Sequence, residues 1–340
     1  MSKKNSSVNL KNGFKDFKDL SSIFINFKNK LNKLRNKSYV VAVSGGPDSL
    51  ALAALTKAYS YVKKSKFNYV LIDHNIRKNS AKEARQVKSL LKKHQIPLNI
   101  FLNKKKIEKN IQSQAREVRY EILTSYCRRK KINTILTAHN LEDQVETFFI
   151  RLSRGSGLHG LSSMKEITKI DNNITLARPM LGIKKNHLIK ISKVAFGKYF
   201  KDPSNNNTKF LRTRIRKLKK ILEKSGINYD QIFKSIKNLA SSRDTLDIYF
   251  GKIYKNVVSK KKNKVLINSK ILNDLNEEMK MRVFKKSIQD FTNSYYATRA
   301  KKIFQLIHQI ESTKKAKFTL GGCLILREKN HIILRKENKS

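Results

Sequence analysis

The chain has 340 residues, with 75 Lys and Arg against 25 Asp and Glu, so its formal net charge is +50. This length suits two domains with separate cores, and the excess of cations favours a polyanionic partner such as nucleic acid, although a composition rich in Lys, Asn and Ile also follows from AT-rich coding. No apolar run approaches the ~18 residues of a membrane span, and two distant cysteines, Cys127 and Cys323, argue against a disulfide scaffold or a four-cysteine zinc site.

The first half of the chain predicts alternating strands and helices. Residues 1–20 form a basic tail that we expect to be mobile, without the apolar core of a signal peptide, which indicates a cytoplasmic protein. A helix over 20–34 precedes the first strand, and Ser80 and Glu83 have the spacing of a capping box at the start of a later helix. Predicted strands cover 40–43, 67–73, 98–102 and 134–138, and a long helix covers 111–131. The alternation predicts an α/β fold with a doubly wound parallel sheet.

The turn after the first strand has the features of an anion site. The strand leads into Ser44-Gly45-Gly46-Pro47-Asp48-Ser49 and then an amphipathic helix. Adjacent glycines permit positive φ and close approach to a ligand, and proline suits the first helical position. The helix N-terminus favours an anion, and Asp48 could hold Mg²⁺ beside phosphates. A tight turn without a ligand would also fit. Ligands bind at the carboxyl ends of such strands, where Asp73, His74 and His139 follow.

A second segment, 139–147, combines a helix start with acidic residues. Asn140 suits the N-cap and Asp143 the N3 position. Asp143, Glu146 and Thr147 share one face of the predicted helix, and a separate buried stripe is predicted for Val145, Phe148, Phe149 and Leu152. Capping alone would explain Asp143, but it requires neither His139 nor Glu146. The glycines of 155–160 match G-x-G-x-x-G by letter, but they follow a helix, so we interpret them as a C-cap and a flexible loop.

The second half predicts a different organisation. A hairpin is expected over 166–179, a helix over 184–199, and further helices to about residue 250. Helices over 272–289 and 298–310 precede strands over 317–320, 323–327 and 331–335. We therefore predict a catalytic domain over 21–225 and a second, mostly helical basic domain over 226–340.

Two resemblances follow from these motifs. Residues 44–49 resemble the SGGxDS pyrophosphate loop of the N-type ATP pyrophosphatases, the PP-loop superfamily, which adenylate an oxygen of their substrate. The loop is not a Walker A motif, because no Lys-Ser or Lys-Thr pair follows. The segment 139–161 resembles the tRNA(Ile)-lysidine synthetase family, and so do further motifs in matching order: Asp73-His74-Asn75-Ile76-Arg77, Ala115-Arg116 with Arg119-Tyr120, Ala177-Arg178-Pro179, Asp202-Pro203-Ser204-Asn205 and Arg212-Thr213-Arg214-Ile215-Arg216.

Three departures from that family accompany the match. Thr213 stands where the family usually has Asn, and Asn75 stands where Gly is common. Asn tolerates the left-handed conformation, so that exchange suits a turn. The chain ends soon after Leu320-Gly321-Gly322, so we expect the last C-terminal domain of longer members to be missing.

The resemblance implies a ligase that joins free L-lysine to the wobble cytidine of the CAU-anticodon tRNA(Ile), using ATP and Mg²⁺ and changing the codon read from AUG to AUA. The resemblance does not decide whether the protein forms a homodimer. Catalytic roles are implied for Asp48, Arg116, Asp143 and Glu146, with Asp48 as metal ligand. The resemblance assigns ATP binding to Ser44, Gly45, Gly46, Pro47, Asp48, Ser49, Asp73, His74 and His139, lysine binding to Asp143 and Glu146, and tRNA binding to Arg212, Arg214, Arg216 and the second domain.

Two other classes of protein stay open from the sequence. A tRNA thiolase or an amidotransferase-type synthetase could share the loop, but the chain has no Cys-x-x-Cys pair and no glutaminase domain is visible. A catalytically inactive RNA-binding protein would not need Asp48, Asp143 and Glu146. Exchange of pyrophosphate into ATP, with and without tRNA, would separate these classes.

Overall fold

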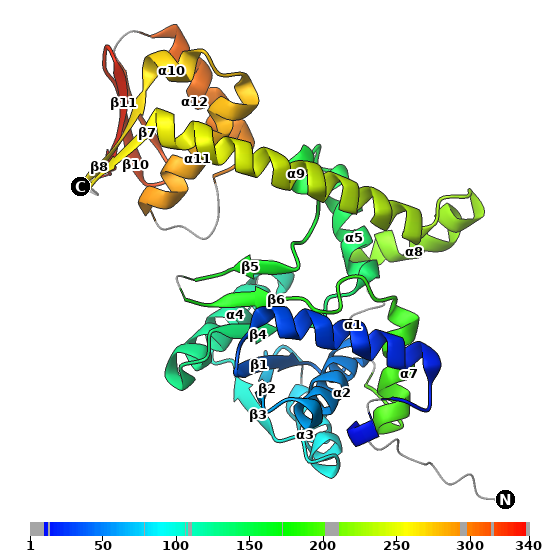
Figure 1. Ribbon diagram of the computed structural model, residues 1–340. Helices are drawn as coiled ribbons and strands as arrows, with labels where there is room; N and C mark the ends of the chain where they lie inside the picture. Colours follow the sequence, from blue (N-terminus) through cyan, green and yellow to red (C-terminus); the bar gives the residue numbers. More distant parts are fainter. Residues whose placement is uncertain are drawn as a thin grey trace, which may run out of the picture. The chain divides into compact units, whose positions relative to one another are not determined.

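The computed structural model describes residues 10–12, 14–77, 79–105, 107, 111–171, 173–200, 211–292, 298–313 and 316–337. The chain divides into two compact units, Met1–Ala240 and Ser241–Ser340 (Figure 1). Helix α9 (Tyr229–Val257) contributes residues to both. Among the helices in the described ranges, none is long and apolar enough to cross a membrane.

The first unit is built on a six-stranded sheet of order β3-β2-β1-β4-β6-β5. Its strands are β1 (Ser38–Val43), β2 (Lys66–Asp73), β3 (Leu98–Leu102), β4 (Thr134–Leu136), β5 (Ile167–Lys169) and β6 (Thr175–Ala177). Every neighbouring pair is parallel except β5 and β6. The predicted doubly wound parallel sheet is therefore confirmed, and its carboxyl edge carries Ser44, His74 and His139.

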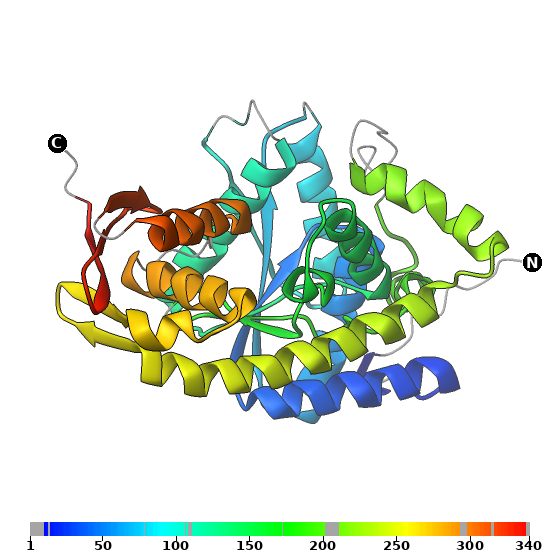
Figure 2. The same cartoon turned by 90° about the horizontal axis from the view of Figure 1, so that it is seen from above.

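Helices cover both faces of this sheet (Figure 2). Helices α1 (Lys18–Leu34), α2 (Pro47–Val62), α3 (Ser80–Lys93) and α7 (Lys185–Phe196) share one core with the face that carries Val41, Val43 and Leu71. Helix α4 (Ile111–Lys130) packs on the other face, against Val40, Val70 and Ile135. A short 3-10 turn, η1 (Leu10–Asn12), joins the first core. Burial on both faces explains why β1 reads as a continuous apolar run.

Two details of the predicted helices are wrong. The helix α3 takes Asn79 as its N-cap without a side-chain hydrogen bond, so Ser80 and Glu83 form no capping box. The Glu83 carboxylate instead pairs with Arg77 at 2.9 Å. On helix α5 (Leu141–Leu152), Val145 is buried as predicted, but Leu152 is 48% exposed because the core beneath α5 ends before its last turn.

A small third core fixes the orientation of α5. Leu141 and Val145 pack with Tyr229, Ile232 and Ile236 of α9. Helix α8 (Leu211–Lys224) also packs against α5, and the short helix α6 (Leu158–Leu161) follows it. This packing turns the polar face of α5 toward α8.

The second unit combines helices with a five-stranded antiparallel sheet of order β7-β8-β11-β10-β9. The strands are β7 (Val258–Lys261), β8 (Lys264–Asn268), β9 (Lys317–Leu320), β10 (Cys323–Arg327) and β11 (His331–Lys336). Helices α10 (Ser269–Asn273), α11 (Glu277–Thr292) and α12 (Ala300–Ser312) lie on one side of it in both views (Figures 1 and 2). Strands β9 to β11 lie where the sequence predicts them, whereas β7 and β8 were not predicted, because the lysine run at 260–262 obscures their apolar alternation.

Candidate active site

The loop between β1 and α2 is closed tightly by one glycine. Gly45 has a φ of +84°, and a Cβ there would lie 2.5 Å from Cγ2 of Val87. Gly46 has a φ of −70°, so only one of the two glycines takes the left-handed conformation. Gly46 is the N-cap and Pro47 the first helical residue, and no side chain caps the first turn of α2. The open amides and the helix dipole therefore form a site suited to an anion.

The two loop serines have different environments. The Ser49 hydroxyl is buried, accepts a hydrogen bond from the Ser44 amide at 3.1 Å and donates to the Gly46 carbonyl at 3.0 Å. Ser49 thus holds the loop closed from inside. The Ser44 side chain is exposed, with its Oγ 3.2 Å from Ser49 Oγ, so it is the serine available to a ligand.

The carboxyl group of Asp48 lies in an environment that disfavours its charged form. Burial raises its pKa to about 6, the nearby charges of Asp143 and Glu142 add to the rise, and Lys185 and Asn140 oppose it. Its Oδ1 is buried and has no hydrogen-bond partner among the described residues. Within the described part of the chain, no group of three or more His, Cys, Asp or Glu residues could hold a metal ion by itself. A site with one or two carboxylates fits Mg²⁺ that also binds substrate phosphates.

At the end of β2, Asp73 shapes the backbone instead of facing open solvent. Its Oδ1 accepts a hydrogen bond from the Asn75 amide at 2.9 Å, and Asn75 has a φ of +53°. This is the left-handed conformation that Asn tolerates in place of glycine. Burial and the charge of Arg119 lower the pKa of His74 to about 4, and its buried Nδ1 has no hydrogen-bond partner in the described part of the chain. Asn103, which the sequence reasoning missed, is buried and donates to the His74 carbonyl at 3.4 Å.

The imidazole of His139 lies within reach of the charges of four arginines. Burial lowers its pKa well below the usual value, and nearby guanidinium charges lower it further, in the order Arg178, Arg116, Arg212 and Arg119. Its Nδ1 lies 2.9 Å from Thr137 Oγ1. The imidazole is therefore neutral at pH 7 and a poor proton acceptor. The convergence of positive charge around it suits a phosphate group.

The N-terminus of α5 forms the predicted capping box. The Asn140 side chain accepts from the Asp143 amide at 2.9 Å, and the Asp143 carboxylate accepts from the Asn140 amide at 3.1 Å. Asp143 Oδ1 also lies 3.9 Å from Arg216. Asp143 therefore caps the helix as predicted, while its carboxylate also lies near Arg216, and its role in lysine binding and catalysis stays a prediction.

Glu146 is buried and enclosed by arginines of α8. Its side chain is 4% exposed, accepts from Arg216 Nε at 2.6 Å and from Arg216 Nη2 at 3.1 Å, and lies 3.2 Å from Arg212 Nε. Burial raises the pKa of Glu146, and the hydrogen bond from Arg216 opposes that rise. Arg212 also reaches Thr147 Oγ1 at 3.4 Å. The acidic face of α5 is thus matched by a basic face of α8.

The three arginines of α8 separate into two sets. Arg212 and Arg216, one turn apart, face α5, whereas Arg214 is exposed on another face. Thr213 between them is buried. Arg151, in the last turn of α5, donates to the carbonyls of Gly160 and Ser163 at 2.7 and 3.0 Å, so it supports the loop after α5.

The sequence did not predict two further contacts near the site, and one predicted motif lies outside the described residues. The Gln144 side chain bonds both backbone groups of Met164 at 2.8 Å, and the Lys185 amide donates to Glu142 at 2.9 Å. Only the position of Gln144 beside the acidic residues of α5 could have signalled it. The motif at 202–205 lies outside the described residues.

Comparisons with known proteins agree with this arrangement. Residues 20–223 match the PP-loop domain family. A tRNA(Ile)-lysidine synthase of Orientia tsutsugamushi is 41% identical over 54% of this chain and 42% of its own length, and that of Wolbachia pipientis wMel is 30% identical over 92% and 74%. The chain thus spans less than half of the first relative. A U34-tRNA thiolase, NcsA, from Methanococcus maripaludis has a similar fold, with a TM-score of 0.53 at 19% identity over 64% of this chain and 80% of its own.

Proposed function

Because the chain belongs to the PP-loop domain family and groups there with the tRNA(Ile)-lysidine synthases, we propose that it is an ATP-dependent ligase acting on tRNA(Ile) in the cytoplasm. The reaction would join free L-lysine to the wobble cytidine of the CAU anticodon, through an adenylated cytidine. The observation that carries the proposal is one sheet edge where the uncapped start of α2, the buried carboxylate of Asp48 and the acidic face of α5 interact electrostatically.

In the first step, cytosine O2 would attack the α-phosphorus of ATP, and the bond to pyrophosphate would break. The amides at the start of α2 and the exposed Ser44 hydroxyl suit the departing pyrophosphate. Arg116, whose charge acts on neutral His139, would stabilise the developing negative charge on the α-phosphate. Asp73 and His74, at the end of β2, would lie beside the nucleoside part of ATP.

Asp48, with Asp143 nearby, would hold Mg²⁺. The buried, unpartnered Oδ1 of Asp48 and its raised pKa fit a carboxylate completed by a cation. When bound, the ion would neutralise negative charge on the phosphates.

In the second step, the ε-amine of lysine would attack C2, AMP would leave, and the amine would lose a proton. Asp143 would counter the lysine ammonium by direct contact, and Glu146 would offset the charges of Arg212 and Arg216, which would otherwise repel that ammonium. Asp143, which would contact the ammonium, would accept the proton, because His139, whose pKa is lowered well below its usual value, is a poor acceptor. Arg212, Arg214 and Arg216 remain candidates for tRNA contact, and the exposed Arg214 needs no rearrangement to make it.

The experiment is to measure AMP release from ATP with tRNA and lysine added singly and together. The proposal expects release that depends on tRNA and is fastest with both, and Asp48→Ala should abolish it while tRNA binding persists. Release that is independent of lysine, or full activity of the variant, would contradict it. The thiolase alternative has little support, because Cys127 and Cys323 are buried in different units and burial raises the pKa of both thiols, to about 12 and about 11.

A further inference from the structure

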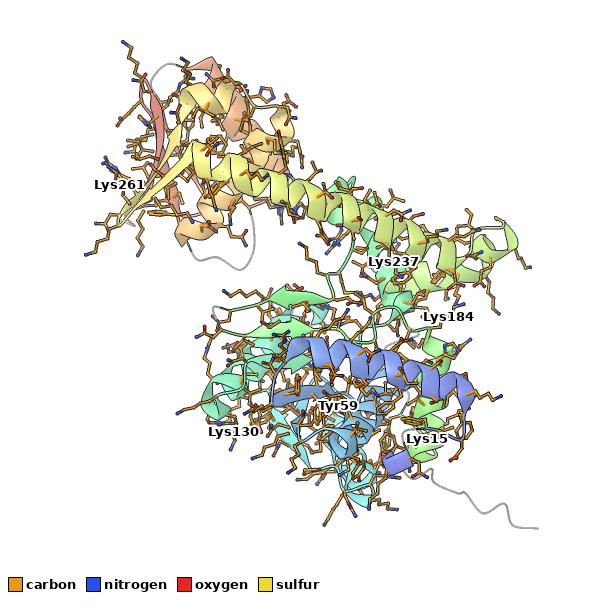
Figure 3. All side chains as sticks on the ribbon, viewed as in Figure 1. Lys15, Tyr59, Lys130, Lys184, Lys237 and Lys261 are labelled. Carbon is orange, nitrogen blue, oxygen red and sulfur yellow. The ribbon has the colours of Figure 1, made fainter. Side chains whose placement is uncertain are left out.

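The start of α7 is fixed against the start of α5. The Leu141 amide donates to the Ile183 carbonyl at 3.1 Å, and the Lys185 amide donates to the Glu142 carboxylate at 2.9 Å. Helix α7 also packs against α2 in the first core. Figure 3 shows Lys184 at the end of α7 that lies beside α5. These contacts fix the point of the backbone from which the side chain of Lys185 extends.

The two adjacent lysines at the start of α7 have different environments. Lys184 is exposed and pairs with Asp230 at 2.6 Å. Lys185 is half-buried, and its ammonium forms no ion pair with any described residue. Glu142 beside it accepts from the Lys185 amide through Oε2, and its Oε1 lies 3.6 Å from Lys219. The backbone of Lys185 is therefore held in place, while its charged end stays available to a ligand.

The charge of Lys185 reaches the anion site at the start of α2. Burial raises the pKa of Asp48, and among the charges that act on this carboxyl group that of Lys185 is the strongest and lowers the pKa. Asp48 lies in the first turn of α2, beside its open amides. Arg216 is also within electrostatic reach of Asp48, but both carboxylate oxygens of Glu146 hold that guanidinium. Of these two cations, only Lys185 can turn toward an anion at α2 without breaking an ion pair.

We propose that Lys185 is a further catalytic residue, whose ammonium contacts the β- and γ-phosphates of ATP and then the departing pyrophosphate. This inference rests on the proposed function for its reaction. When cytosine O2 bonds to the α-phosphorus, the bond from that phosphorus to the bridging oxygen breaks, and its electron pair stays on pyrophosphate. Lys185 donates hydrogen bonds to this growing negative charge and transfers no proton. A lysine ammonium suits that contact, because it is a compact charge with three rotatable donors.

The test measures binding to the full chain by calorimetry, with Mg²⁺ in the buffer and three probes: ATP, inorganic pyrophosphate and AMP. Lys185→Met removes the charge but keeps the backbone amide that donates to Glu142. Because a hydrogen bond to a charged group contributes a factor of roughly 10 to 100 in affinity, the variant should bind ATP and pyrophosphate more weakly by about that factor. AMP binding should be unchanged, because AMP lacks the β- and γ-phosphates.

The matched control is Lys184→Met, which removes an equal charge one residue away and should leave the binding of all three probes unchanged. Lys185→Arg should retain most of the affinity for pyrophosphate, because it keeps a cation that donates to phosphate. Lys185→Gln repeats the measurement with a polar side chain if Lys185→Met does not fold. An equal loss of affinity for AMP, an equal loss in Lys184→Met, a loss in Lys185→Arg as large as in Lys185→Met, or unchanged affinity for pyrophosphate would overturn the inference.

These binding measurements need neither tRNA nor lysine, so the inference and the proposed function fail separately. A wild type that attaches no lysine to tRNA, together with a selective loss of pyrophosphate affinity in Lys185→Met, would refute the proposed function and leave the inference standing. A wild type that attaches lysine, together with unchanged pyrophosphate affinity in Lys185→Met, would refute the inference alone. A wild type that binds neither ATP nor pyrophosphate would refute both.

Discussion

The Glu146–Arg216 pair allows a quantitative test of the site. A double-mutant cycle with Glu146→Gln, Arg216→Gln and both together isolates their coupling free energy. Breaking a fully buried pair costs about 3–5 kcal/mol. Here Glu146 is 4% exposed, but Arg216 is 31% exposed and Arg212 remains 3.2 Å from the carboxylate. Allowing for solvent screening and for this second cation, we expect a coupling of about 1.5–3 kcal/mol.

The assay is urea unfolding followed by far-UV circular dichroism, since the chain has no Trp. The transition of the first unit is the one analysed. The control cycle uses Lys184→Met and Asp230→Asn, a pair at 2.6 Å whose side chains are 50% and 57% exposed, which should couple by at most about 1 kcal/mol. A Glu146–Arg216 coupling below about 0.5 kcal/mol would refute the reasoning and leave Glu146 available as a direct ligand for lysine.

Three further predictions concern the glycines of the loop before α2, the carboxylate of Asp48 and the hydrogen bonds between Gln144 and Met164. Gly45→Ala should lower the free energy of unfolding by about 1–3 kcal/mol and abolish ATP binding in calorimetry, because of its φ of +84° and its contact with Val87. Gly46→Ala, at an N-cap with a φ of −70°, should cost less than about 1 kcal/mol. Burial raises the pKa of Asp48 from 3.8 to about 6. Between about pH 4 and pH 6 the folded protein therefore keeps a proton that the unfolded chain has lost. The free energy of unfolding without ligand should decrease as the pH rises through this range. Urea titrations of Asp48→Asn should not show this decrease. Gln144→Ala should lower the free energy of unfolding by about 2–4 kcal/mol in the same titrations, because it leaves both backbone groups of Met164 unpaired. A loss no larger than that of the exposed control Leu152→Ala would contradict a structural role for these two hydrogen bonds.

The sequence predicts the elements whose signals are local. The strand over 98–102 and the three last strands are found where expected, because apolar alternation and turn residues lie within each segment. The capping box of Asn140 and Asp143 forms for the same reason. The capping box expected at Ser80 does not form, since Glu83 has a closer cationic partner in Arg77.

Features that depend on tertiary pairing could not be predicted. The arginines of α8 alternate in sequence, but only the packing of α8 against α5 decides that Arg212 and Arg216 meet Glu146 while Arg214 does not. The pairing of Lys264 with Arg335 likewise depends on register between segments some 70 residues apart. No local periodicity carries that information.

The central claim is that this chain attaches lysine to the wobble cytidine of a CAU-anticodon tRNA(Ile). The most direct measurement is nucleoside mass spectrometry of that tRNA after incubation with the full chain, ATP and isotope-labelled lysine. The account predicts a new cytidine derivative that contains the labelled lysine, forms only with ATP, and is lost in Asp48→Ala. Unchanged cytidine in a tRNA that the protein binds, under conditions where it also binds ATP, would contradict the account.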